Sequence, residues 1–287
     1  MPSEVVDVNK AAFLGTGLLG GAMVERMLQQ GVAVRVWNRT ESKARALESK
    51  GATVAATPSE AVVGADRVHL ALAEDAVVDE VVETVLPSLE KDAIIIDHST
   101  TSPVGTGGRQ RRLAMGSVRF LHAPVFMSPQ MCRDGVGLMM VSGASALFEQ
   151  VKPALERMTG EVWYVGDRPD LAACYKLFGN SLIFSINAGL ADVLSLARGL
   201  DVPSEDAIAV FAHFKAGNII LMRGEKMARG DLSAMFELTM ARKDLRLMLD
   251  AAGDEALAIL PAIGRRMDDA IAKGHGRDDL VAIAVKE

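Results

Sequence analysis

The sequence has too few cysteines to build a disulfide framework. Cys132 and Cys174 are its two cysteines, and they show neither a CxxC pair nor the spacing of zinc ligands. The five histidines are scattered along the chain: His69, His98, His122, His213 and His275. We therefore expect no disulfide scaffold and no metal site.

Long apolar runs and one-sided charge are missing as well. Residues 2–10 lack the continuous apolar core of a signal peptide, and no later run approaches the ~20 apolar residues of a membrane span. The formal net charge is −6 without a basic stripe, whereas a nucleic-acid interface needs clustered lysine and arginine. These absences predict a cytoplasmic protein whose partners include neither a membrane nor nucleic acid.

What the chain does have is a globular composition and a regular alternation in its first half. Its 287 residues are 49% hydrophobic, enough for one large or two ordinary domains. Apolar strand-like runs end at Gly15, Trp37, Leu72, Asp97, Ala123, Gly143 and Gly166. Residues 21–30, 42–50 and 77–90 have the length of crossover helices. This alternation predicts a mostly parallel, doubly wound α/β sheet with helices on both faces, the Rossmann architecture.

After Gly166 the pattern changes to helical spacing. Residues 171–200 are apolar at helical intervals and are too long for an ordinary surface helix. Residues 202–221, 233–252 and 255–273 also have helical character, and strand signals are absent. We therefore predict an α/β domain over residues 1–166 and an all-α domain over 167–287, which begins with a long interdomain helix.

A glycine-rich turn joins the first strand to the first helix. The string GTGLLG directly follows the strand, and the next strand comes within about thirty residues. Glycine is needed first for the tight turn, then for close approach to a pyrophosphate, and last for packing of helix on strand. The turn predicts a dinucleotide site formed by Gly15, Thr16, Gly17, Leu18, Leu19 and Gly20.

The end of the second strand favours NADP(H) over NAD(H). An NAD site places an acid there to bind the ribose 2′-hydroxyl, but this chain has Asn38, Arg39 and Thr40. An acid would repel a 2′-phosphate, whereas Arg39 can pair with it and its two neighbours can add neutral hydrogen bonds.

Several motifs together resemble those of the β-hydroxyacid dehydrogenase family. They are GTGLLGGAM, VWNRT, DHSTTSP at residues 97–103, KLFGN at 176–180, ARKDLRLMLDAA at 241–252 and GHGRDDLVAI near the end. The resemblance spans nearly the whole chain in the right order. It implies a Rossmann domain, a helical domain begun by a long helix, and a homodimer or homotetramer.

The resemblance also implies roles for single residues. Lys176 matches the lysine that exchanges the hydroxyl proton while hydride passes between the nicotinamide and the substrate carbon. Asn180, one helical turn later, and Ser99 would bind substrate, while Thr100 and Lys243 would lie near the nicotinamide. From the residues alone, Ser99 and Thr100 also fit a helix N-cap before Pro103.

The chain departs from the family at the segment that cradles the substrate carboxylate. Phe126, Met127 and Ser128 stand where Ser-Gly-Gly is expected, His122 replaces an acid, and Gly179 replaces an asparagine. Ser128 or Gln130 could take over carboxylate binding, or the substrate could be larger and less polar.

Three functions follow from these features. The leading one is an NADPH-dependent reductase of a small aldehyde or keto acid. The second is an imine or bulky-ketone reductase, because the altered segment resembles that of the related imine reductases. The third is an NADPH-binding sensor or interaction protein without catalysis.

Overall fold

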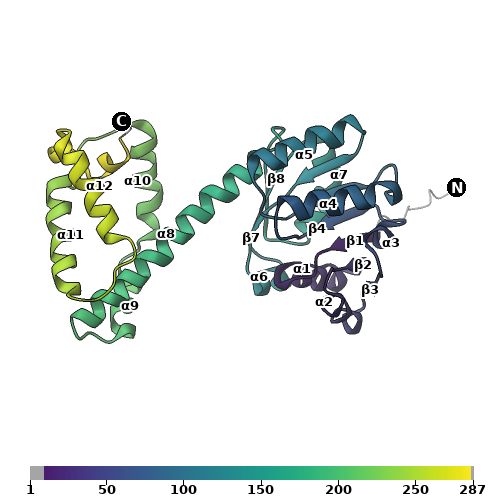
Figure 1. Cartoon of the computed structure of the whole chain (residues 1–287), viewed down its shortest axis with the longest axis horizontal. Helices are drawn as coiled ribbons and strands as arrows, with labels where there is room; N and C mark the ends of the chain where they lie inside the picture. The colour runs from purple at the N-terminus through teal and green to yellow at the C-terminus, as the bar shows by residue number, and fades with distance from the viewer. Residues whose placement is uncertain (1–9, 286–287) are drawn as a thin grey trace. The chain divides into compact units, whose positions relative to one another are not determined.

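The computed structural model describes residues 10–285, which form two compact units. The first unit ends at Gly179 and the second begins at Asn180. The sheet ends at Gly166, the boundary expected from the sequence, but the first unit continues into the long helix α8 (Leu171–Gly199). The first turns of α8 therefore belong with the sheet (Figure 1).

The first unit is built on a single nine-stranded sheet. Its path is β3-β2-β1-β4-β5-β6-β8-β7, with β9 paired to β8. The first six strands of this path are parallel to one another, whereas β8 runs antiparallel to β6 and β7 and parallel to β9. The strands are β1 (Lys10–Leu14), β2 (Ala33–Trp37), β3 (Thr53–Val54), β4 (Arg67–Leu70), β5 (Ile94–Asp97), β6 (Arg119–His122), β7 (Val125–Phe126), β8 (Leu138–Ser142) and β9 (Glu161–Gly166). The order of the parallel half is that of dinucleotide-binding folds, which confirms the predicted fold.

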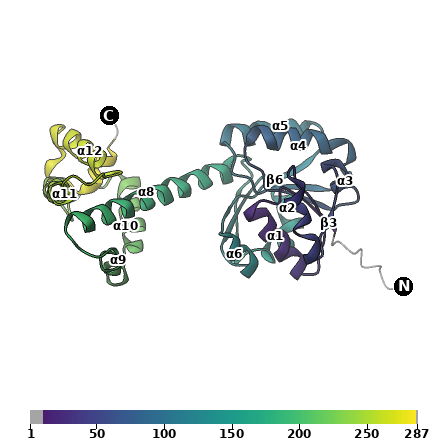
Figure 2. The ribbon, with the colours of Figure 1, turned by 60° about the horizontal axis from the view of Figure 1, so that its bottom comes forward.

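Helices cover both faces of this sheet because its central strands are apolar on both sides. Phe13 and Ile96 pack under α1 (Leu18–Gln29), α2 (Glu41–Arg45), α6 (Pro129–Asp134) and α7 (Ser145–Glu156). Leu14 and Ile95, the neighbouring residues in β1 and β5, pack under α3 (Pro58–Val62), α4 (Asp75–Val85) and α5 (Pro103–Met115). Figures 1 and 2 show α4 and α5 on the side of the sheet opposite α1 and α6. The two-residue periodicity of strands thus divides the core into two layers.

The second unit is helical, as predicted. It contains the rest of α8, α9 (Ser204–His213), α10 (Gly217–Arg229), α11 (Leu238–Ala252) and α12 (Leu260–Ala272), with a core that includes Leu238, Leu245 and Met267. The expected helix over 202–221 is two helices, since α9 ends at His213. The buried carboxylate of Asp192 in α8 accepts hydrogen bonds from three successive backbone N–H groups at the start of α12, which ties these two helices together.

Helix α8 is long and apolar enough to cross a membrane by length and composition alone. Its best 18-residue window has a mean hydropathy of 1.4, and 6% of that window is buried. The sequence prediction that no stretch approaches a membrane span is wrong in this respect. Polar residues such as Asn180 and Ser185 interrupt the apolar run, so a search for an unbroken run overlooks a helix whose average is high.

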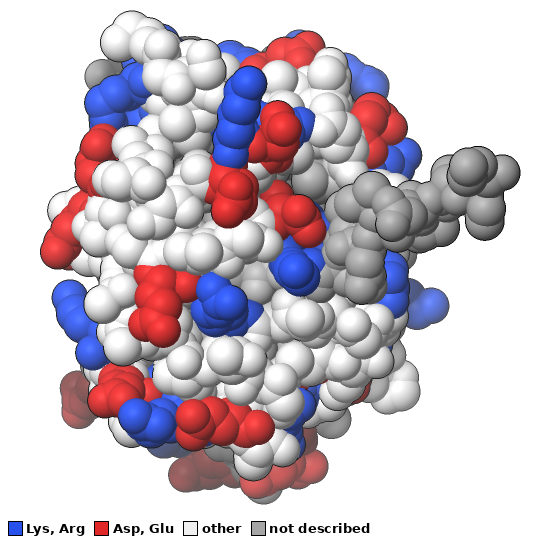
Figure 3. Space-filling model, turned by 90° about the vertical axis from the view of Figure 1, so that its right-hand side faces the viewer, with Lys and Arg blue, Asp and Glu red and all other residues white. Residues whose placement is uncertain are grey.

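The face of the molecule in Figure 3 carries acidic and basic side chains in alternation. Lysine and arginine do not gather into a patch on the described part of that face.

Candidate active site

The glycine turn after β1 has the geometry that a dinucleotide requires. Gly15 has a φ of +100°, and a Cβ there would lie 2.3 Å from the carbonyl oxygen of Ala71. A Cβ on Gly20 would lie 2.0 Å from the oxygen of Gly15, so that helix α1 packs directly on the turn. Gly17 has open space around it and caps α1 without a side-chain hydrogen bond. The first N–H groups of α1 are therefore left for a ligand such as a phosphate.

A pocket of about 530 Å³ opens beside this turn. Ten of the predicted site residues line it: Gly15, Gly17, Leu18, Leu19, Gly20, Asn38, Arg39, Thr40, Ser99 and Thr100. Thr16 supports the turn instead, because its backbone N–H donates to Oδ1 of Asn38 at 3.0 Å. The carboxyl ends of β1, β2, β4 and β5 thus converge on one site, as the fold requires.

Two cations stand at the end of β2. Arg39 is exposed on the pocket wall, and its guanidinium has no hydrogen-bond or ion-pair partner within residues 10–285. Lys43 lines the same pocket one helical turn later. Lys43 was not predicted as a site residue, although it lies four residues after Arg39, at the start of the helix expected over residues 42–50. Glu80 of α4 is the acidic residue that lines this pocket.

Asn38 has a structural part in this wall. Its Oδ1 accepts from Thr16 and its Nδ2 donates to the carbonyl oxygen of Thr40 at 2.9 Å. These two bonds hold the end of β2 against the glycine turn, so Asn38 fixes the place of Arg39.

The loop after β5 is held rigidly beneath the pocket. Oγ of Ser99 accepts from the backbone N–H of Leu72 at 2.9 Å, and the Ser99 N–H donates to Oδ1 of Asp97. Nε2 of His122 donates to the carbonyl oxygen of Ser99 at 3.0 Å. His122, the residue that replaces the family's acid, therefore supports the loop. The helix cap predicted for Ser99 or Thr100 belongs to Ser102, whose Oγ accepts from Gly105.

A fully buried arginine, Arg109, connects the starts of helices α4 and α5 through hydrogen bonds. It was not predicted as a site residue. Arg109 in α5 donates to Oδ1 of Asp79 at 2.8 Å and to Oδ1 of Asp75 at 3.0 Å. Asp75 in turn accepts from the backbone N–H of Ser102. An arginine that is 0% exposed needs such paired acids to compensate its desolvation, and the network joins the start of α4 to the start of α5.

Lys176 lies in the second turn of α8 and points to β7. Its Nζ donates to the carbonyl oxygen of Val125 at 2.6 Å and lies 4.0 Å from the centroid of the Phe126 ring. Burial lowers the pKa of Lys176, while the ring face and the carbonyl both favour the charged form. The first unit thus holds an ammonium group against β7.

Phe126 and Gly179 are physically coupled. A Cβ on Gly179 would lie 2.2 Å from Cζ of Phe126, so the ring occupies the space that a side chain at position 179 would need. Phe126 and Gly179 are both departures from the family pattern, and they depend on each other. The aromatic ring on β7 fits only because residue 179 on α8 has no side chain.

Three other predicted residues form their side-chain contacts with residues other than Lys176. Oγ of Ser128 caps α6 by accepting from Met131, and Nε2 of Gln130 donates to Oδ1 of Asp134 on the same helix. Asn180 begins the second unit one turn beyond Lys176, and Lys243 lies in α11, where it pairs with Asp244 at 2.7 Å.

Three histidines are buried in the first unit, which the sequence analysis did not foresee. Nδ1 of His98 lies 2.8 Å from the carbonyl oxygen of Ala123, and Nδ1 of His69 lies 2.9 Å from Nε2 of His98. A carbonyl only accepts, so His98 carries its proton on Nδ1 and accepts at Nε2 from His69. Burial lowers the pKa of His69, of His98 (to about 4) and of His122, so all three are neutral at pH 7.

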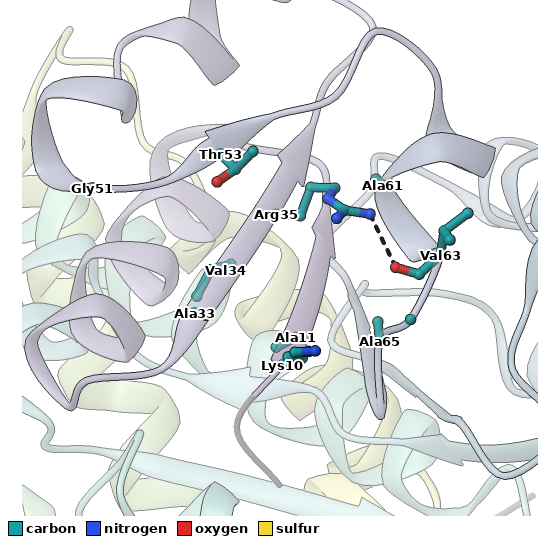
Figure 4. Close-up of a pocket in the computed structure, with 11 residues that line it drawn as sticks. Lys10, Ala11, Ala33, Val34, Arg35, Gly51, Thr53, Ala61, Val63 and Ala65 are labelled. Carbon is teal, nitrogen blue, oxygen red and sulfur yellow. Dashed lines mark hydrogen bonds between the residues drawn. The ribbon is translucent and has the colours of Figure 1, made fainter. Parts of the chain in front are cut away.

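A smaller hollow of about 200 Å³ lies at the opposite ends of β1 and β2 (Figure 4). Lys10, Arg35 and Thr53 are among its lining residues. The guanidinium of Arg35 donates to the carbonyl oxygens of Glu60 and Val63. Because this hollow lies at the amino ends of the strands, it is not the dinucleotide site.

Comparison with known proteins agrees with the geometry of the pocket. Residues 10–166 match the family described as the NAD binding domain of 6-phosphogluconate dehydrogenase. The chain is 30% identical to 3-sulfolactaldehyde reductase of Escherichia coli over 95% of its own length and 93% of that protein. It is 24% identical to 2-(hydroxymethyl)glutarate dehydrogenase of Eubacterium barkeri, over 96% and 93%.

A solved structure supports the fold independently. The imine reductase of Myxococcus stipitatus in complex with NADP+ is similar with a TM-score of 0.89 at 20% identity, over 96% of this chain and 98% of that one. The chain belongs to the β-hydroxyacid dehydrogenase family, with a nucleotide-binding domain of the 6-phosphogluconate dehydrogenase type, and is an NAD(P)-dependent oxidoreductase.

Proposed function

We propose that this enzyme is an NADPH-dependent reductase that converts the carbonyl group of a small aldehyde or keto acid to a hydroxyl group, reversibly. The observation that carries the proposal is the half-buried ammonium of Lys176, which is held at β7 on the same unit as the glycine-turn pocket. A positioned acid of this kind suits proton donation to a carbonyl oxygen.

Reduction adds a hydride and a proton across the C=O bond. When bound, NADPH supplies the hydride with the electron pair of the new C–H bond. Nζ of Lys176 gives its proton to the oxygen, which becomes the hydroxyl group, and the lysine is left as a neutral amine. Because burial lowers the pKa of Lys176, that neutral amine forms more readily than it would on an exposed lysine.

NADPH, rather than NADH, is favoured by the charge at the end of β2. Arg39 and Lys43 both line the pocket wall there, against the single acid Glu80. Two cations provide charge-assisted hydrogen bonds for a 2′-phosphate, and the absence of an acid in positions 38–40 removes the group that would hold the 2′-hydroxyl of NAD.

The remaining roles stay predictions from the family resemblance. Ser99 accepts from Leu72 and keeps its own O–H proton for donation to substrate. We assign substrate positioning to Ser99 and Asn180, and the nicotinamide end of the cofactor to Thr100 and Lys243.

A second candidate activity is reduction of an imine or a bulky ketone. It is favoured by the ring of Phe126, which lies against Lys176 and fills the space at Gly179. An aromatic face offers apolar contact area in the segment where relatives are expected to cradle a carboxylate. Retention of Lys176 favours the carbonyl reaction, because a carbonyl oxygen needs a proton donor as the hydride arrives, whereas the more basic imine nitrogen can be protonated by solvent beforehand.

A substrate panel separates these activities. Oxidation of NADPH would be followed by the loss of its absorbance in the presence of semialdehydes, glyoxylate, bulky ketones or cyclic imines. Turnover of semialdehydes or glyoxylate supports the main proposal, and turnover restricted to cyclic imines overturns it. Failure of a folded, NADPH-binding protein to turn over any substrate would favour the sensor.

We also propose that the enzyme is a homodimer or homotetramer in the cytoplasm. Apolar side chains along α8 are exposed in the single chain, among them Phe178, Ile183 and Phe184, and a second copy would cover them. Cys132 and Cys174 are both free thiols, which fits a reducing compartment. Light scattering on the purified protein tests the assembly, and a monomer would refute it.

A further inference from the structure

The aromatic ring of Phe126 covers one side of the Lys176 ammonium group. Nζ of Lys176 lies 4.0 Å from the ring centroid, well within the distance of about 6 Å over which a ring face attracts a cation. On another side, Nζ donates to the carbonyl oxygen of Val125 at 2.6 Å. Two successive residues of β7 therefore supply both contacts.

No carboxylate shares this task within residues 10–285. No aspartate or glutamate there forms an ion pair with Lys176, and burial lowers the pKa of its ammonium group. An ammonium group that is half-buried without an acidic partner loses hydration, which only neutral groups can then replace. The ring face of Phe126 and the carbonyl oxygen of Val125 are those groups.

The contacts also limit the directions in which Lys176 can donate. An ammonium group has three N–H bonds, and all of them are donors. One donates to Val125, and the ring of Phe126 occupies a second side of the group. Nζ has no further hydrogen-bond acceptor in the described part of the chain. A donor direction is therefore left for a ligand.

Both sides of this contact are attached to the same strand. β7 pairs antiparallel with β8, and Oγ of Ser142, the last residue of β8, accepts from the backbone N–H of Ala172 in the first turn of α8 at 3.2 Å. The bare backbone of Gly179 leaves the space in which Cζ of Phe126 lies. The ring and the ammonium group are thus held in place before any ligand arrives, which is the preorganisation that proton transfer needs.

We propose that Phe126 is a positioning residue for proton transfer: its ring and the carbonyl of Val125 hold the ammonium group of Lys176 so that its remaining N–H donates to the carbonyl oxygen of the substrate. The inference rests on the proposed role of Lys176 as the proton donor. In the reduction this N–H bond breaks, the proton passes to the oxygen, and a neutral amine remains. Since a ring face attracts only the charged form, Phe126 also keeps Lys176 protonated to a higher pH than burial alone would allow.

Titration of Lys176 in the variant Phe126→Leu tests the electrostatic part without any turnover. The Cε resonance of 13C-labelled lysine reports the titration, and the signal of Lys176 is the one that Lys176→Ala removes. Leucine is apolar but has no aromatic face, so we expect the pKa of Lys176 to fall by about 0.5–1 pH unit. A ring that only fills space would give the opposite sign, because a smaller side chain admits water and raises the pKa of a buried lysine. An unchanged or higher pKa would overturn the proposal.

A matched control removes another ring from the first unit. Phe148 stacks on Tyr164, and Phe148→Leu should leave the pKa of Lys176 unchanged. If Phe126→Leu does not fold by circular dichroism, Phe126→Met, whose unbranched side chain also lacks an aromatic face, takes its place. An equal fall of the pKa in the control and in the Phe126 variant would refute a specific role of this ring.

The pH profile of carbonyl reduction tests the positioning part. Turnover should decline on the alkaline side as Lys176 loses its proton, and in Phe126→Leu this decline should begin about 0.5–1 pH unit lower. At lower pH its kcat should fall about tenfold, since the N–H is no longer fixed in direction, while the Kd for NADPH is unchanged. An alkaline decline and a kcat equal to those of the parent enzyme would overturn the proposal. If the parent enzyme reduces no carbonyl compound, the proposed function fails, and the titration of Lys176 still decides whether the ring acts on it.

Discussion

The buried histidines predict that the first unit loses stability in mild acid, well before its carboxylates titrate. His98 has a pKa of about 4 in the folded protein and about 6.5 in an unfolded chain. Between these values the unfolded chain binds a proton that the folded chain does not, so stability rises with pH. Above about pH 6.5 both states are neutral and the effect vanishes.

The size of the effect follows from that difference. At pH 5 the unfolded state gains about 2 kcal/mol relative to pH 7.5 from His98 alone, and about 3 kcal/mol once the pH falls below 4. The pKa values of His69 and His122 are also lowered by burial, so both add in the same direction. Asp75, whose pKa is lowered by hydrogen bonds from Ser102 and by Arg109 although partial burial opposes this, contributes only below about pH 5.

Urea unfolding at pH 7.5, 6 and 5 measures this. Trp37 and Trp163 are the two tryptophans and both lie in the first unit, so their fluorescence reports on the unit that holds the histidines. His98→Leu should unfold at lower urea at every pH but show a weaker dependence on pH. His213→Asn, a change at an exposed histidine of α9, should keep the full dependence. A transition midpoint that stays constant from pH 7.5 to 5 would refute the burial argument.

Two further predictions concern the cofactor and the aromatic ring on β7. Arg39→Ala and Lys43→Ala should each raise the KM for NADPH about tenfold with little change for NADH, because a charge-assisted hydrogen bond is worth on the order of 1.5–3 kcal/mol; steady-state kinetics with both cofactors measure this, and equal effects would argue against a 2′-phosphate site. Gly179→Ala should destabilise the protein by about 1–3 kcal/mol, since the added methyl group meets Phe126. The same change in a Phe126→Ala background should cost much less, and an additive double-mutant cycle from urea unfolding would show that the two residues are not coupled.

Much of the fold can be predicted from local sequence patterns. The elements that were not predicted are short segments in which such a pattern is missing. The seven longer strands are predictable because each lies in a mostly apolar run between turn signals. Strands β3 and β7 have two residues each, which is too short for any periodicity. No proline or glycine marks the break between α9 and α10 until Gly217. The helical spacing therefore predicts one continuous helix across the break.

The residues of the candidate site also fall into two groups, those that could be predicted from the sequence and those that could not. The glycine turn and Arg39 were predictable because their chemistry depends on neighbours in sequence. The contact of Lys176 with Val125 joins residues 51 positions apart, and that of His69 with His98 spans 29. Such pairs are brought together by strand order, so composition and spacing could not reveal that Phe126 fills the space at Gly179.

Lys176→Ala tests the central claim most directly. The variant should lose about 10²–10⁴-fold in kcat/KM for carbonyl reduction, the usual contribution of a positioned acid, while its Kd for NADPH, measured by fluorescence, stays nearly unchanged. Far-ultraviolet circular dichroism would verify that the variant is folded. Near-normal carbonyl reduction by this folded, NADPH-binding variant would contradict the assignment of Lys176 as the proton donor.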